Sequence, residues 1–514
     1  MKYDFIIIGA GSAGCVIASR LSENPTNSVL LVEAGPDYTN LENMPSDIKY
    51  GYDAASVLKG PHMWGYQANS MQGHGTTFNL PRGKVVGGSG AVNGQVWLRG
   101  MPDDYDNWAD SGNAEWAFHK ILPFLNIIES DSDFGGDFHG YNGPTPVFRH
   151  DKNDWLPSQH AFFQACRDVG IPECWDMNDP EATGVGPRPF NNVDGIRMST
   201  ALTYLDMARH RLNLTVRART MVRRILFDGS RAIGIEADSG SESFAIEGQR
   251  IIVSCGAIAS PQLLLLSGIG PNNQLRSLAI PIVNDLPGVG KNLRDHPLVS
   301  LKFRAQPELF NNTDILWSQV GLRYTTNGST TKNDVQIFPI WWSTDTEGEP
   351  FDQLTIFRIS AGLENAASSG ELHIVSNDPY THPAIDYNYL NDVEDRRKLR
   401  EAIRLCIGLS THTAFRDILL ERITPTDVDL DTDETLDSWL LCNVTTQQHS
   451  AGTCKMGPIT DQMAVVDQYC RVHGVDNLSI VDASVMPDVI RANTNLTTIM
   501  IAERVADWIT NGKA

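Results

Sequence analysis

The chain has 514 residues, with 41 Lys and Arg against 62 Asp and Glu, so its formal net charge is −21. This length predicts more than one lobe, and the acidic excess repels phosphate backbones and anionic membrane surfaces, which excludes a general nucleic-acid-binding protein. Hydrophobic residues make up 41% of the chain and charged residues 20%, values that exclude wholesale disorder.

The N-terminal residues predict one βαβ unit. Tyr3–Ile8 is a short apolar run typical of a strand buried on both faces, Cys15–Leu21 has helical spacing, and Ser28–Glu33 is a second buried strand. Such a unit is the building block of nucleotide-binding folds.

A glycine-rich turn, Gly9-x-Gly11-x-x-Gly14, joins the first strand to the helix, and Glu33 follows Gly14 by 19 residues. Gly9 permits a tight turn, Gly11 lets the backbone approach a pyrophosphate, and Gly14 lets helix and strand pack closely. Glu33 is placed to accept hydrogen bonds from ribose hydroxyls. The pattern therefore predicts a dinucleotide site, and its spacing leaves NAD and FAD open.

Periodicity predicts the later elements less sharply. We expect helices at Trp116–Ile128, Gln159–Val169, Pro261–Leu266, 393–420 and at the end of 482–513, and strands at Leu214–Ala237 and Ile251–Cys255. Alternating patterns over 300–390 predict an antiparallel sheet. Nucleotide-fold pieces at both ends and in the middle of the chain indicate that a second domain is woven in.

The cysteines and acidic runs do not predict a metal site. The 8 cysteines form no C-x-x-C pair and lack zinc-ligand spacing, so we expect free, buried thiols. Asp427-x-Asp429-x-Asp431 resembles the start of a calcium loop, but the sixth position is Thr432 and the twelfth is Ser438. We expect a solvated acidic loop there, with a helix N-cap near Thr432 or Asp433.

The N-terminus lacks the pattern of a secretory signal, and no apolar run reaches the ~18 residues needed to span a bilayer. We therefore expect no transmembrane segment and a cytoplasmic location.

Four further blocks combine glycines with chemically active side chains: Arg82–Gly94, Gly256–Pro271, His449–Gly457 and Val481–Asn495. Together with the first glycine turn, in this order and spacing, they resemble the glucose–methanol–choline (GMC) family of flavoprotein oxidoreductases over nearly the whole chain. Leu286–Pro297 is also typical of that family.

The resemblance implies an α/β fold in which a Rossmann-like FAD-binding domain is interwoven with a substrate domain, built on a mainly antiparallel sheet with flanking helices. We assign residues 1–150, 190–300 and 440–514 to the FAD-binding domain. Residues 151–189 and 301–439 are assigned to the substrate domain.

The resemblance also implies FAD rather than NAD. The cofactor-binding positions that it carries over are Gly9, Gly11, Ser12, Ala13, Gly14, Glu33, Val86, Gly87, Gly88, Ser89, Asn93, Gly94, Val222, Asp482, Ala483 and Asn495. Some members attach FAD through a histidine immediately before the asparagine of the second block. Here that position is Val92, so we predict non-covalent FAD.

The C-terminal blocks carry the expected chemistry. By position in the family, His449 is the catalytic base and Asn493 its partner, while the substrate carbon faces flavin N5 as the hydride acceptor. Histidine suits this role because its ordinary pKa is about 6.5. Cys454 follows closely, and packing explains it better than nucleophilic chemistry.

The substrate is predicted from the residues beside the base. In choline-type members the residue before the histidine is often aromatic and helps to cage a quaternary amine, whereas here it is Gln448. With Gln447 it predicts a polar pocket and oxidation of a small polar or aromatic primary alcohol to the aldehyde. Trp341 and Trp342 either wall this pocket or pack within the sheet.

Several alternatives stay open. The protein could be a choline-type dehydrogenase, a non-redox flavin lyase or decarboxylase of the same fold, or a flavin-free binding protein. The electron acceptor is expected to be oxygen or a quinone-like carrier.

Overall fold

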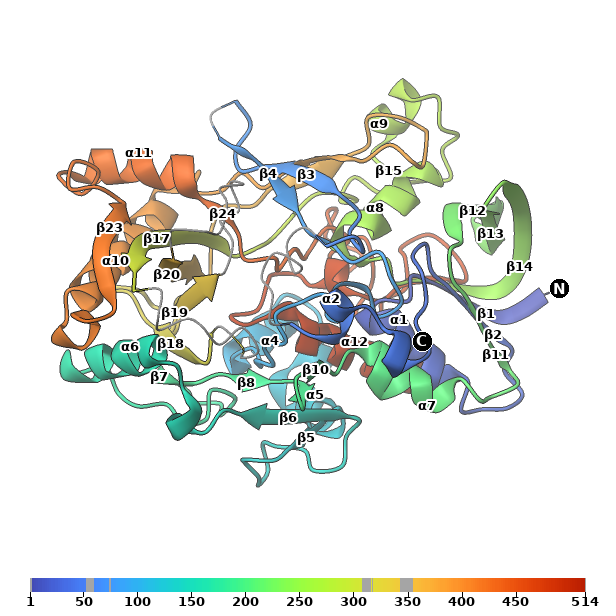
Figure 1. The fold of residues 1–514 in the computed structure, drawn as a ribbon. Helices are drawn as coiled ribbons and strands as arrows, with labels where there is room; N and C mark the ends of the chain where they lie inside the picture. The colour runs from blue at the N-terminus through green and yellow to red at the C-terminus, as the bar shows by residue number, and fades with distance from the viewer. Residues whose placement is uncertain are drawn as a thin grey trace.

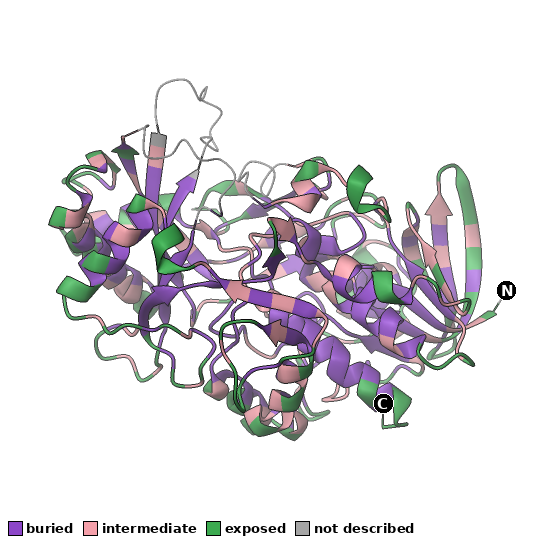
Figure 2. Cartoon of the chain, turned by 60° about the horizontal axis from the view of Figure 1, so that its bottom comes forward, coloured by how far each residue is buried: buried purple, intermediate pink, exposed green. Residues whose placement is uncertain are grey.

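The computed structural model describes residues 2–51, 60–73, 75–306, 316, 318–342 and 355–513. Two large sheets lie at opposite ends of the molecule, with helix α12 (Thr494–Thr510) between them (Figure 1). Buried residues run through both sheets and the region that joins them (Figure 2).

The first sheet has the order β11-β2-β1-β14-β13-β12, with β25 paired to β14. Its strands are β1 (Lys2–Ile8), β2 (Val29–Val32), β11 (Leu214–Arg217), β12 (Met221–Asp228), β13 (Arg231–Ser239), β14 (Glu242–Val253) and β25 (Leu478–Ile480). β11, β2, β1, β14 and β25 run parallel, and β12 to β14 form an antiparallel meander.

The predicted βαβ unit is confirmed. Phe5–Ile8 of β1 and the whole of β2 are continuous apolar runs because both of their faces are covered, and helix α1 (Ser12–Leu21) packs against α12. Helix α1 begins three residues before the expected Cys15, since Ser12, Ala13 and Gly14 lack an apolar period but continue the first turn.

The second sheet has the order β23-β17-β20-β19-β18-β7, with β24 paired to β17, and every pairing is antiparallel. Its strands are β7 (Gly184–Pro187), β17 (Pro297–Ala305), β18 (Val320–Tyr324), β19 (Val335–Trp342), β20 (Thr355–Leu363), β23 (Leu419–Thr424) and β24 (Thr445–Thr446). Helices α6 (Pro157–Asp168), α10 (Val393–Ser410) and α11 (Asp433–Asn443) flank it. The predicted antiparallel sheet with flanking helices is therefore confirmed.

Shorter elements complete the fold. The other helices are α2 (Ser46–Lys49), α4 (Pro102–Asp110), α5 (Phe118–Ile127), α7 (Asp206–Ala208), α8 (Gly256–Leu266) and α9 (Asn272–Ser277), and Ala201–Leu205 is a π-helix. The smaller sheets contain β3 (Tyr66–Asn69), β4 (Thr77–Leu80), β5 (Glu129–Asp131), β6 (Thr145–Arg149), β8 (Pro189–Phe190), β9 (Asn192–Val193), β10 (Ile196–Arg197), β15 (Ile269–Gly270), β16 (Asn284–Asp285), β21 (Glu371–His373) and β22 (Ala384–Asp386).

The helix expected over 393–420 is correct only as far as Ser410. Beyond it the chain turns and enters β23, which pairs with β17 at the edge of the second sheet. The expected N-cap is confirmed at Thr432, whose side chain accepts from the backbone N–H of Thr435.

All 8 cysteines carry free thiols, and 6 of them are buried, as predicted; Cys255 is half-buried and Cys442 is exposed. Among the helices in the described parts of the chain, none is long and apolar enough to cross a membrane.

Candidate active site

A cavity of about 470 Å³ lies between the two large sheets and is lined by residues of both. The carboxyl ends of β1 and β2 open into it through Ile8 and Glu33, the place where open α/β sheets bind ligands. From the second sheet, Leu298 of β17 and Phe338 and Ile340 of β19 form the opposite wall. The cavity thus joins the nucleotide fold to the antiparallel sheet.

The glycine turn forms the floor of one half of the cavity. The backbone at Gly9 has φ +94°, and a Cβ at Gly14 would lie 1.9 Å from the carbonyl oxygen of Gly9, so this turn excludes a side chain there. A Cβ at Gly11 would meet nothing closer than 3.9 Å. Helix α1 then begins at Ser12 and directs its free N–H groups toward the cavity end, as anion sites require.

Glu33 stands at the end of this half. Its carboxylate accepts the backbone N–H groups of Ala10 at 2.9 Å and Gly35 at 2.8 Å. Burial raises the pKa of Glu33 to about 7, although these hydrogen bonds oppose the rise. The side chain is thereby held where a ribose hydroxyl would meet it.

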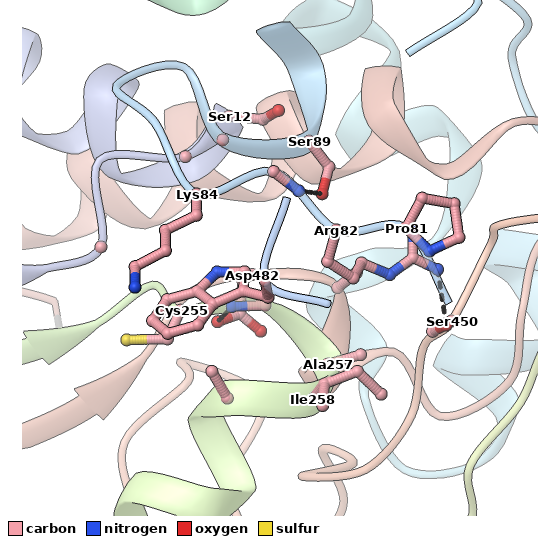
Figure 3. Close-up of a pocket in the computed structure, with 18 of the residues that line it drawn as sticks. Ser12, Pro81, Arg82, Lys84, Ser89, Cys255, Ala257, Ile258, Ser450 and Asp482 are labelled. Carbon is pink, nitrogen blue, oxygen red and sulfur yellow. Dashed lines mark hydrogen bonds between the residues drawn. The ribbon is translucent and has the colours of Figure 1, made fainter. Parts of the chain in front are cut away.

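The cation of Lys84 and the start of a second helix, α8, lie beside the same half of the cavity. Lys84, Arg82 and Asp482 lie around the cavity (Figure 3). Asp482 accepts the backbone N–H of Gly256 at 2.8 Å, at the start of α8, and a Cβ at Gly256 would meet nothing within 4 Å. An anion-binding helix end, the cation of Lys84, a ribose-type carboxylate and glycines open toward the cavity fit a dinucleotide such as FAD.

The predicted catalytic pair lies at the other half. The amide nitrogen Nδ2 of Asn493 lies 2.9 Å from Nε2 of His449. Because an amide N–H donates, Nε2 accepts, and the proton of the neutral imidazole is assigned to Nδ1. Nε2 is the ring nitrogen that carries the lone pair in this tautomer, so a substrate hydroxyl would reach it by replacing the amide N–H of Asn493.

His296 and Asp295 hold the base in place. Nδ1 of His449 lies 2.8 Å from Nδ1 of His296, which is fully buried. One oxygen of Asp295 accepts the backbone N–H groups of His296 and His449, each at 2.8 Å. The other accepts the hydroxyls of Tyr389, at 2.6 Å, and Thr446. One buried carboxylate therefore anchors both histidines.

Both imidazoles are neutral at neutral pH. Burial lowers the pKa of His449 well below its usual value, and the positive charges of Arg82 and Arg188 add to this effect. Burial lowers the pKa of His296 to about 3. A neutral His449 is the form that can accept a proton.

Most of the predicted residues line this one cavity. They are Gly9, Gly11, Ser12, Ala13, Glu33, Gly88, Ser89, Asn93, Gly94, Val222, Asp482, Ala483 and Asn495, together with Gln448, His449 and Asn493. Gly14, Val86 and Gly87 stand behind the wall, where Gly14 packs on Gly9 and the N–H of Gly87 donates to Ala10 at 2.7 Å.

The two tryptophans are placed differently. Side chains alternate along β19, so Phe338 and Ile340 face the cavity while Trp341 is buried in the hydrophobic core. Trp341 thus packs within the sheet rather than walling the pocket, which corrects its assignment as a pocket residue. The side chain of Trp342 lies outside the described part of the structure.

Sequence reasoning missed several residues of the site. Asp295 and His296 lie in the block Leu286–Pro297, whose family pattern was the available signal for them. Arg82 donates to the carbonyl of Gln448 at 2.9 Å and to the hydroxyl of Ser450 at 2.7 Å, the second bond being visible in Figure 3. Arg188 also lines the cavity and had no sequence signal.

A second charged cluster lies outside the cavity. Glu129, Asp131 and His139 bring their ligand atoms within 4.8 Å of one another. Arg99 pairs with Glu129 at 2.6 Å and Arg149 with Asp131 at 2.9 Å, so cations of the chain already neutralise these carboxylates. The cluster is a buried ion-pair network.

Comparison with known proteins gives a consistent result. GMC oxidoreductase family profiles match residues 3–298 and 366–502. The chain is 34% identical to the oxygen-dependent choline dehydrogenase of Vibrio vulnificus (strain YJ016), covering 99% of this chain and 94% of that protein. The enzyme of the same name from Escherichia coli (strain K12) is 35% identical, with 100% and 96% covered.

Solved structures agree in fold. Pyridoxine 4-oxidase from Mesorbium loti matches with a TM-score of 0.90 at 28% identity, with 99% of each chain covered. A fungal aryl-alcohol oxidase matches with a TM-score of 0.84 at 21% identity, with 99% of each chain covered, which shows the fold alone. With its cavity, its blocks and these matches in place, the chain belongs to the GMC family of FAD-dependent oxidoreductases, which act on CH–OH donors.

Proposed function

We propose that this protein oxidises a primary alcohol to the aldehyde, with His449 as the base. The observation that carries the proposal is the pairing of a neutral His449 with Asn493 at the cavity wall, 2.9 Å apart. FAD supplies the hydride acceptor when it is bound. Nε2 of His449 takes the hydroxyl proton, and the amide of Asn493 holds the hydroxyl oxygen.

We propose that FAD is held non-covalently in the half of the cavity that contains the glycine turn. Glu33 would bind the adenine ribose, the end of α1 and Lys84 the pyrophosphate, and Asn93 and Asn495 the flavin region. Val92 lines the cavity and offers no nucleophile for attachment. Acid precipitation should leave the flavin in the supernatant; flavin retained on the precipitated chain would contradict this part of the proposal.

Two observations bear on the substrate class, and they favour different alcohols. The choline dehydrogenases, at 34% to 36% identity, favour a choline-type alcohol over the small polar or aromatic alcohol expected from sequence. Gln447 and Gln448 line the cavity where an aromatic cage would be needed for choline, which favours a polar alcohol. A non-redox lyase or decarboxylase is the remaining alternative, and reduction of the flavin by an alcohol would exclude it.

The test is anaerobic mixing of the holoenzyme with a panel of primary alcohols. Alcohols that bleach the flavin support the proposal. His449→Ala should retain FAD but slow bleaching at least ~100-fold, the scale of lost general-base catalysis. Bleaching at the wild-type rate in this variant would overturn the role of His449, and absence of bleaching by every alcohol in the wild type would overturn the function.

Admitting air to the reduced enzyme then tests the electron acceptor. Rapid reoxidation with peroxide release indicates oxygen, and slow reoxidation indicates a quinone-like carrier. The domain boundaries and the cytoplasmic location stay predictions.

A further inference from the structure

Arg188 is a buried cation in the wall of the cavity. It lies between β7 and β8, at the edge of the second sheet, and is 3% exposed. Its charge lowers the pKa of His449, so it lies within electrostatic reach of the catalytic base. Arg188 therefore belongs to the half of the cavity that faces the substrate.

Among the described residues, the guanidinium has no counter-ion in contact. Its Nη1 donates to the hydroxyl of Ser318 at 2.9 Å, and its Nε has no hydrogen-bond partner in the described part of the chain. No carboxylate among the residues that the structure describes lies within the 4.0 Å of an ion pair. A buried positive charge without a paired carboxylate carries a large desolvation cost unless a bound anion neutralises it.

The charges nearby do not compensate Arg188. Burial lowers the pKa of Arg188 to about 10, a drop that Glu364 opposes, so the guanidinium stays charged at neutral pH. Burial raises the pKa of Glu364 itself to about 8, which leaves that carboxyl protonated at neutral pH. His449 and His296 are neutral, and Arg82 is another cation.

Arg188 also occupies the aromatic face that a substrate cation would need. Its Cζ lies 4.6 Å from the ring centroid of Phe338, which is itself a cavity residue. A quaternary ammonium binds by approaching such a ring face. Here the protein's own cation covers the ring and repels a second positive charge.

We propose that Arg188 binds an anionic group, a carboxylate or phenolate, on the alcohol substrate, and that it selects against choline-type cations. This inference rests on the proposed function, whose substrate it specifies. The guanidinium offers unpaired N–H donors in a planar fork, the geometry that suits a carboxylate.

The experiment measures equilibrium binding to the holoenzyme, without turnover. The probes are benzoate, benzamide and benzyltrimethylammonium, which share one ring and carry charges of −1, 0 and +1. Dissociation constants come from the perturbation of flavin absorbance. We expect benzoate to bind about ten- to a hundredfold more tightly than benzamide, the scale of a charge-assisted hydrogen bond, and the cation to bind most weakly.

Arg188→Met keeps the bulk of the side chain and removes its charge, so the preference for benzoate should vanish. Arg224→Met is the matched control, because Arg224 is a 57% exposed arginine of β12 that does not line the cavity, and the preference should persist there. Arg188→Lys, which keeps the charge, should retain part of the preference if Arg188→Met does not fold.

Three results would overturn the inference: benzyltrimethylammonium binding as tightly as benzoate in the wild type, the preference surviving in Arg188→Met, or its loss in the Arg224→Met control. His449→Ala should still prefer benzoate, because binding does not use the base. A benzoate preference in an enzyme that no alcohol reduces would refute the proposed function and leave the anion site standing.

Discussion

Replacing His296 with leucine tests how His449, the proposed catalytic base, is held in the tautomer that can accept a proton. In the assigned tautomer, the Nδ1–H of His449 donates a hydrogen bond to Nδ1 of His296, which lies 2.8 Å away and is fully buried. Without this acceptor, a buried N–H of His449 loses its partner, at a cost of about 1–3 kcal/mol. The imidazole then favours the tautomer with its proton on Nε2, which cannot accept the substrate proton.

That cost sets the expected size of the effect. At about 1.4 kcal/mol per factor of ten, His296→Leu should slow anaerobic flavin reduction about 5- to 150-fold. His296→Asn is the matched control, because its side-chain carbonyl can stand where Nδ1 stood and accept the same proton. The asparagine variant should therefore reduce the flavin at a rate near that of the wild type.

Stopped-flow measurement of flavin reduction, with thermal unfolding of each variant, separates positioning from folding. Equal losses of rate in the leucine and asparagine variants would mean that His296 acts through packing alone. A leucine variant that reduces flavin at the wild-type rate would refute the assigned tautomer.

The remaining predictions concern stability. Gly14→Ala should lower the melting temperature and the affinity for FAD, since its Cβ would lie 1.9 Å from a backbone oxygen and overpacking costs about 1–3 kcal/mol. Gly408→Ala is the control, because a Cβ there meets nothing within 4 Å and should lower neither quantity. Equal effects of the two variants would refute the close packing at Gly14. The raised pKa of Glu364 means that the folded state holds a proton that the unfolded state lacks between pH 4.5 and about 8, so stability falls as pH rises through this window. Glu364→Gln should flatten this fall in melting temperature, and an unchanged slope would contradict it. Burial lowers the pKa of His139, but its carboxylate neighbours raise it to about 11, so its contribution is complete below pH 6.5 and is lost between pH 6.5 and 11. His139→Gln should reduce the melting temperature at pH 6 more than at pH 10, whereas equal losses would indicate a packing role.

The parts of the fold that could be predicted have a local signal. β1, α1 and β2 follow one another within 31 residues, and their periods and glycines specify each element and its neighbour. The prediction of a helix through residue 420 was wrong beyond Ser410, because the residues of β23 form a strand by pairing with β17, more than a hundred residues earlier. Likewise, β3 pairs with β22 through Asn69 and Asp386, and no local pattern in residues 66–80 predicts this contact.

The residues of the site also differ in how far the sequence predicts them. His449 and Asn493 were predictable because the family blocks carry them, although the contact between them joins two segments 44 residues apart. Asp295 and His296 stood in a recognised block, but their role depends on hydrogen bonds to the backbone and the side chain of His449, more than 150 residues away. Arg188 is a single arginine between two short strands. Its proposed role follows from its contacts with Ser318 and Phe338, which lie beside it only in the folded sheet.

The charge of the whole chain therefore gave no guide to the charge of its cavity. The chain carries −21, yet the charged residues that line the cavity are Arg82, Lys84 and Arg188 against Glu33 and Asp482. Lys84 acts on Glu33 in the nucleotide half, where a pyrophosphate would meet it. Arg188 lies instead in the substrate half, stacked on Phe338. In the proposed binding mode the FAD pyrophosphate would meet Lys84 and the end of α1. Arg188 then has no counter-ion among the described residues, and an anionic substrate would supply one.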